Sequence, residues 1–161
     1  MDPAPITSEQ FRKACGRFPT GVTVTTTLGD DGTPHGITVS SFTSVSLDPP
    51  LVLVCIDLRS QMTEHLKMDR PFAINILGDH QQHLSVQFSK RLKDRFDNVP
   101  WYPGCNGVPL LSDVPAAFEC RVTRMIDAGD HRMILGLVQH ISFGAKRPLT
   151  YVNSAYQRAA Q

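Results

Sequence analysis

Hydroxyl and basic side chains gather in three short segments of this sequence, and together they could bind one phosphorylated ligand. They are Thr38, Ser40 and Ser41; Arg59, Ser60 and Thr63; and Ser85, Gln87, Lys90 and Arg91. Free backbone N–H groups at a helix start, hydroxyl groups and guanidinium groups all bind phosphate. Each segment also fits a simpler interpretation, since Ser60 could be only a helix cap and the other side chains could simply face solvent.

The stretch 36–56 would position the first of these segments. Within it, residues 37–40 alternate apolar and hydroxyl side chains, which is typical of a strand with one apolar face. The prolines of 48–50 interrupt the backbone ladder, and residues 51–56 form a continuous apolar run that predicts a strand buried on both faces. Hydroxyl groups beside such a core strand suit a flat heteroaromatic ligand with a phosphate tail. An ordinary half-exposed strand, with Thr and Ser on its solvent side, is the alternative.

The first part of the chain predicts a helix followed by a β-hairpin. Thr7 and Gln10 have the spacing of a capping box, and Gly16 is a plausible end for the helix that they open. Residues 22–27 are rich in β-branched side chains, and residues 29–32 contain the Asp-Gly pair of a tight turn. The strand 22–27 should therefore pair antiparallel with the strand that follows.

The middle of the chain predicts two further helices around a strand. Ser60 should open the first helix, which should end near residues 69–70 because the next residue is proline. Residues 72–77 read as a strand. A second helix should start near Asp79 and run into the basic residues that end at 95–96, with Leu84 and Phe88 on its buried face.

The last third of the chain changes in character. Residues 97–115 are rich in proline and glycine, and an irregular segment of this length indicates a lid or a contact between subunits. Residues 117–125 and 133–143 predict two strands joined by a turn at 127–131.

These elements favour a mainly β fold in a single domain that covers residues 1–161. Helices do not alternate regularly with strands, which argues against a doubly wound parallel sheet. An antiparallel β-barrel with a few short helices packed outside fits the order of elements best.

Composition excludes several classes of partner. The formal net charge is +1, which is too low for a broad nucleic-acid-binding face. No apolar stretch is long enough to span a membrane, and the polar, proline-containing start does not resemble a secretory signal. The cysteines are scattered without a C-x-x-C pair, so we expect reduced thiols and a cytoplasmic protein.

Common catalytic and metal-binding motifs are also missing. The sequence has no dinucleotide-binding glycine motif, no phosphate-binding Walker loop, no G-x-S-x-G and no H-E-x-x-H. His80 and His83 share a helix face, but no third ligand accompanies them, so a solvated face is the favoured interpretation. We therefore expect no metal site.

Four sequence blocks resemble the short-chain flavin reductases, the reductase components of two-component flavin-dependent monooxygenases. The blocks are Phe18-Pro19-Thr20-Gly21-Val22-Thr23-Val24, Gly36 to Leu51 with its Thr-Val-Ser-Ser-Phe and Asp-Pro-Pro parts, Lys93-Asp94-Arg95-Phe96, and Gly129-Asp130-His131. The resemblance covers nearly the whole chain in the same order. Position 37 is Ile where methionine is common in the family.

The resemblance implies an FMN-binding split barrel, a homodimer, and hydride transfer from NADH or NADPH to FMN or FAD. The reduced flavin would then diffuse to a monooxygenase. By this likeness, the residues that contact flavin are Pro19, Thr20, Thr38, Val39, Ser40, Ser41, Arg59, Ser60, Thr63, Asn75, Ser85, Gln87, Phe88 and Lys90. The resemblance is weaker around Arg59, which lies in a variable part of the family.

The resemblance also gives a role to His131. A histidine in a turn is most often only solvated, but the Gly-Asp-His turn of the family lies against the nicotinamide. His131 would then position the nicotinamide, and no side chain needs to act as a general acid. Two rival functions remain: a flavin- or haem-binding carrier or sensor without nicotinamide turnover, and a barrel that serves only as an interaction module.

Overall fold

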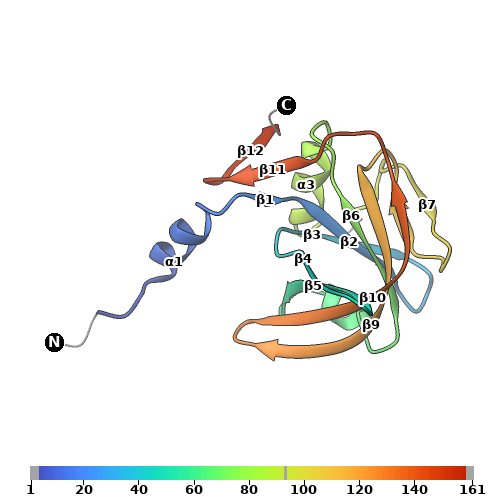
Figure 1. Cartoon of the computed structure of the whole chain (residues 1–161), viewed down its shortest axis with the longest axis horizontal. Coiled ribbons are helices and arrows are strands. Elements are labelled where there is room, and N and C mark those ends of the chain that lie inside the picture. Colours follow the sequence, from blue (N-terminus) through green and yellow to red (C-terminus); the bar gives the residue numbers. More distant parts are fainter. Residues whose placement is uncertain (1–3, 93, 159–161) are drawn as a thin grey trace.

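A computed structural model describes residues 4–92 and 94–158, and its main feature is one strongly curved antiparallel sheet (Figure 1). Lys93 of the Lys-Asp-Arg-Phe block lies outside the described residues. Every neighbouring pair of strands in this sheet is antiparallel. In spatial order the strands are β3 (Pro34–Val39), β2 (Thr23–Leu28), β6 (Pro71–Ile76), β9 (Ala116–Ala128), β10 (His131–Phe143), β5 (Pro50–Asp57) and β4 (Thr43–Leu47).

Smaller elements surround the main sheet. A three-stranded sheet has the order β1 (Thr20–Gly21), β11 (Leu149–Val152), β12 (Ala155–Arg158), and a hairpin consists of β7 (Trp101–Pro103) and β8 (Pro109–Leu111). The helices are α1 (Ser8–Cys15), α2 (Met62–His65) and α3 (Gln82–Ser89). None of the described helices has the length and apolar character needed to cross a membrane.

The main sheet curves until β3 and β5 approach each other, but no backbone ladder joins these strands in the described residues. The hydroxyl of Ser41 spans the seam instead, since it accepts a hydrogen bond from Cys55 N (2.9 Å) and donates one to Cys55 O (3.2 Å). The result is an antiparallel barrel that is open along one seam. The expected mainly β architecture with a few short helices is confirmed.

Two clusters of buried side chains form the core. The first fills the barrel and includes Val54, Phe72 and Ile134. The second lies under α3 and the segment before β9, and it includes Leu84 and Phe88. The barrel therefore has a dry interior, and any site for a large polar ligand must lie on its outer side.

The strand predictions are confirmed with one correction. The hairpin of β2 and β3 and the hairpin of β9 and β10 form at the expected turns. The expectation that residues 51–56 are buried on both faces is wrong: Val52, Val54 and Ile56 are buried, while Leu51, Leu53 and Cys55 are half-buried. The difference arises because the outer face of β5 lies at an incompletely covered part of the barrel wall.

The helices agree with the sequence less closely. The capping box and the end at Gly16 are confirmed in α1, yet none of its side chains is buried, and Figure 1 shows α1 standing away from the main sheet. The helix after Ser60 has only four residues, because Leu66 leaves the helical conformation. The helix α3 buries Leu84 and Phe88 as predicted, but it ends at Ser89, before the basic residues.

Residues 97–115 belong to the scaffold. The side chains of Val99, Val108, Leu110, Leu111 and Val114 are buried in the second core cluster. This packing contradicts the interpretation of the segment as a lid. Its exposed aromatic residues, Trp101 and Tyr102, remain open to a contact with another protein.

Close packing around Gly136 yields a stability prediction. A Cβ at this buried position of β10 would lie 2.5 Å from Phe72 Cζ and 3.0 Å from Cys120 Cβ. We expect Gly136→Ala to lower the free energy of unfolding by about 1–3 kcal/mol in urea denaturation, as overpacking does. Gly21→Ala is the matched control, because no atom lies within 4 Å of its added Cβ. Equal stability of the two variants would contradict this packing.

Candidate functional site

A groove made of adjoining cavities lies on the outer side of the barrel beside β3. Three cavities that share lining residues compose it, and we name each one by a residue that it contains. The His131 cavity measures about 290 Å³, the arginine cavity about 540 Å³ and the His35 cavity about 420 Å³. Ile37 and Asp57 line both of the first two cavities, and Gln61, Leu92 and Arg95 line both of the last two. Volumes in this range are typical of small-molecule sites.

The His131 cavity brings together two parts of the predicted site that are far apart in the sequence. Its lining includes the whole segment Thr38 to Ser41, together with Cys55 and His131. The register of β5 and β10 explains this arrangement, because it places His131 opposite Asp57 at the end of both strands. The lining is largely uncharged, with small hydroxyl groups and backbone, so it can accommodate a flat heteroaromatic ring.

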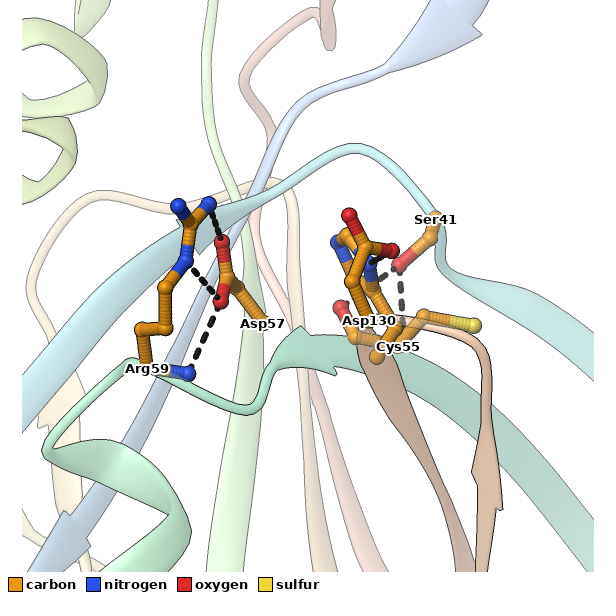
Figure 2. A network of polar contacts seen from close by, with 6 residues as sticks. Ser41, Cys55, Asp57, Arg59 and Asp130 are labelled. Atoms are coloured by element: carbon orange, nitrogen blue, oxygen red, sulfur yellow. Dashed lines mark hydrogen bonds and ion pairs between the residues drawn. The ribbon is translucent and has the colours of Figure 1, made fainter.

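The hydroxyl groups of this segment are used mainly by the fold. Thr38 donates to Ser85 O at 2.7 Å. Figure 2 shows the second contact, in which the hydroxyl of Ser41 is hydrogen-bonded to the backbone of Cys55. Ser40 is exposed, and its hydroxyl makes no hydrogen bond within residues 4–92 and 94–158. Ser40 is therefore the hydroxyl of the segment that is available to a ligand.

The arginine cavity supplies positive charge next to the uncharged His131 cavity. Arg59, Ser60, Arg91 and Arg95 line it. Asp57 holds Arg59 in place, with Asp57 Oδ2 at 2.7 Å from Nη2 and Asp57 Oδ1 at 3.1 Å from Nε (Figure 2). These hydrogen bonds keep the pKa of Asp57 well below its usual range. Because Asp57 offsets much of the charge of Arg59, the remaining positive charge is concentrated at Arg91 and Arg95.

Arg95 also fixes the chain that follows α3. Its Nη1 donates to Gly36 O at 2.8 Å and its Nε donates to Lys90 O at 2.7 Å, while burial lowers its pKa. Arg95 and Asp57 line the groove but were not among the predicted contact residues. The Lys-Asp-Arg-Phe block could have indicated Arg95, whereas Asp57 gives no signal beyond its place at the end of an apolar run.

Three of the predicted flavin contacts are buried in this structure and take part in its packing. Asn75 is fully buried and donates to Val24 O and Thr26 Oγ1. Phe88 is fully buried in the core, and Ser85 is 1% exposed with its hydroxyl on Tyr156. A ligand in the groove cannot reach them without displacing this packing.

Other predicted contacts lie outside the lining of the groove. Thr63 donates to Ser60 O, and Gln87 donates to the carbonyl oxygens of Arg95 and Asp97, so both hold local backbone. Lys90 is exposed but lines none of the three cavities, and Pro19 and Thr20 lie at β1, whose pairing partner is β11. Among the predicted contacts of the segments 59–63 and 85–90, only Arg59 and Ser60 line the groove as the described residues form it.

His131 lies where a second hollow meets the groove. The α1 cavity, about 640 Å³, is lined by Phe11 and other residues of the α1 region on one side and by Asp57, Arg59, Asp130 and His131 on the other. His131 Nδ1 is 2.7 Å from Asp130 Oδ1, and this contact lowers the pKa of Asp130. Gly129 has φ 63°, which allows the tight turn that holds this pair. His131 can therefore contact ligands in both hollows.

A comparison with known protein families matches residues 15–160 to the flavin reductase like domain. The chain belongs to this family. The flavin reductase (NADH) of Kitasatospora aureofaciens is 42% identical over 164 residues, which cover 98% of this chain and 85% of that protein. The stachydrine N-demethylase reductase subunit of Rhizobium meliloti (strain 1021) is 43% identical over 91% of this chain, but the match spans only 64% of that protein's length.

Solved structures of this family share the fold. The NADH:FAD oxidoreductase of Streptomyces globisporus C-1027, solved in complex with NAD and FAD fragments, superposes with a TM-score of 0.89 and 35% sequence identity, and the match covers 98% of each chain. The resemblance to flavin reductases and the split-barrel architecture are thus confirmed. The longer relatives contain sequence that this chain does not match.

The seam hydrogen bonds give a prediction that separates scaffold from ligand contacts. We expect Ser41→Ala to lower the free energy of unfolding by about 0.5–1.5 kcal/mol, because it removes the hydrogen bonds to the N–H and C=O of Cys55. Ser40→Ala should change the free energy of unfolding by less than about 0.5 kcal/mol. Denaturation of both variants in urea measures the difference. A Ser41→Ala protein as stable as the Ser40→Ala protein would show that the hydroxyl does not hold the seam.

Proposed function

We propose that this protein is an NAD(P)H-dependent flavin reductase that transfers hydride from NADH or NADPH to FMN or FAD. The observation that carries the proposal is the position of His131, at the junction of the groove and the α1 cavity. Two ligands could occupy these adjoining hollows and meet beside His131. Membership of the flavin reductase family and the activities of its relatives support the assignment.

The groove has the chemical character that a flavin requires. The His131 cavity offers backbone and the hydroxyl of Ser40 to a ring system, and the arginine cavity offers Arg91, Arg95 and the restrained Arg59 to a phosphate. A bound flavin supplies the chemistry by accepting hydride from the reduced nicotinamide. The contribution of this chain is to hold the ligands in contact and to exclude water from between them.

His131 and Asp130 would act by positioning. Asp130 restrains the imidazole through the contact at Nδ1, which leaves Nε2 and the ring face to contact a nicotinamide or its carboxamide. Hydride transfer of this kind needs no general acid at that place. The reduced flavin would then leave the protein and serve a partner monooxygenase.

The activity is tested with NADH oxidation and flavin titration on the same proteins. We expect NADH consumption to require added FMN or FAD. His131→Ala should lower kcat/KM for NADH by roughly five- to thirtyfold while flavin affinity stays within about twofold, because one contact to the nicotinamide is lost.

His83→Ala is the matched control, since His83 is exposed on α3 and lines none of the cavities at the groove. Flavin binding without any NADH oxidation would favour the carrier or sensor function instead. Equal losses in NADH turnover and flavin affinity for His131→Ala would indicate that the turn is structural.

We also propose that the protein is a homodimer, because it exposes large apolar side chains on strands of the main sheet. Leu47 is 96% exposed on β4, and Phe143 is 85% exposed on β10. The helix α1 presents Phe11 at 63% exposure and buries none of its own side chains. An eight-residue helix is marginal in water without packing, so a second subunit would stabilise it.

We further propose a cytoplasmic location, which the four free thiols support.

The dimer is tested by light scattering at micromolar concentration. Leu47→Asp should weaken self-association by at least about tenfold, because it places a charge in an apolar contact. Met68→Asp, at an exposed apolar residue outside these strands, should leave the mass unchanged. A wild-type protein that is monomeric at this concentration would rule out the dimer.

A further inference from the structure

The His35 cavity continues the groove past the arginine cavity, and nothing in the proposed hydride transfer uses it. At about 420 Å³ it is larger than the His131 cavity at the other end. An FMN molecule whose ring lies at the His131 cavity and whose phosphate lies near the arginine residues would leave the His35 cavity empty. The groove is therefore longer than FMN alone requires.

The wall of this cavity suits a planar base. His35 lies on the wall, and its ring stacks on His65 of α2 with a centroid distance of 3.7 Å and an interplanar angle of 17°. Burial lowers the pKa of His35, and the nearby His65 and Arg95 lower it further while Asp31 opposes them. Burial and the neighbouring His65 therefore both disfavour the protonated imidazole. Met62, which also lines the cavity, adds an apolar surface.

The polar groups of the cavity are those that recognise an adenosine phosphate. Gln61 is exposed and lines both this cavity and the arginine cavity, and its amide can pair with the edge of adenine. Arg95 lies between the same two cavities and uses Nε and Nη1 on backbone carbonyls, which leaves further N–H groups for phosphate. Asp94 supplies a carboxylate that can accept hydrogen bonds from ribose hydroxyls and would repel an additional phosphate.

We propose that the His35 cavity binds the adenosine diphosphate half of a dinucleotide, with the base against His35 and Gln61 and the phosphates at Arg95. This inference rests on the proposed flavin reductase function and deepens it. The order of the three cavities favours FAD as the source, because its ring, phosphates and adenosine would follow one another from His131 to His35. NADH contains the same moiety and is the other possible source.

The experiment measures two ratios on wild-type protein. The first is the dissociation constant of FMN over that of FAD, from fluorescence titration. The second is the KM of reduced nicotinamide mononucleotide over that of NADH, with FMN as the acceptor. We expect the FMN/FAD ratio to be about ten or more. A high value of the second ratio alone would assign the cavity to NADH.

Variants of residues that line the His35 cavity then test whether the cavity causes the high ratio. His35→Ala should reduce the high ratio by about five- to fiftyfold, the effect of losing one stacked base, and leave FMN affinity within about twofold. Gln61→Ala, at an exposed side chain that should not affect folding, should reduce the same ratio by a smaller factor. His83→Ala is the control and should change neither ratio.

Two results would overturn the proposal. One is that both ratios are close to one in the wild-type protein. The other is that His35→Ala and Gln61→Ala weaken FMN and FAD equally, or weaken neither. FMN reduction that proceeds normally in these cases would leave the proposed function intact, whereas a protein that binds no flavin at all would contradict the proposed function itself.

Discussion

The barrel depends on a seam at which strand pairing stops and the hydroxyl of one side chain supplies the hydrogen bonds instead. The ladder between β4 and β5 ends at Thr43 and Leu53, so the backbone groups of Cys55, two residues further along β5, have no ladder partner from β4. Ser41 satisfies both groups of Cys55 with one hydroxyl, which can donate and accept at the same time. The same contact fixes the chain just after β3, and thereby the wall of the His131 cavity. Architecture and ligand site thus share one hydrogen-bonding residue.

Buried hydroxyl groups perform a similar function in β2. Thr23, Thr26 and Thr27 are almost fully buried, and their hydroxyls donate to the backbone oxygens of Val39, Pro109 and Pro71. The strand is central and covered on both faces, so these hydroxyls hold neighbouring segments in register rather than facing water. Thr25, whose Oγ1 is buried without a partner among the described residues, is the exception.

The sequence predicted local structure well and the site in part. Short-range interactions involve only a few residues, so the sequence predicts them directly. Examples are the turns at 29–32 and 127–131 and the capping box at Thr7. Whether a polar side chain faces a ligand or the scaffold depends on tertiary neighbours, so the sequence alone could not show that Asn75 and Ser85 are buried and bonded within the scaffold. Asp57 was missed for the same reason, because its role arises from strand register and from the side chain of Arg59.

The ion pair of Asp57 and Arg59 has a consequence for how long a ligand remains bound. Arg59 is 74% exposed, and its guanidinium is already engaged by a carboxylate, so its attraction for a phosphate is weak and screened by water. The attraction of the groove for a phosphorylated ligand therefore depends mostly on Arg91 and Arg95, and differences in affinity are expressed mostly in the dissociation rate. At physiological ionic strength, we expect this partial neutralisation of Arg59 to shorten the residence time of a phosphorylated ligand and so to favour its exchange with the pool in solution.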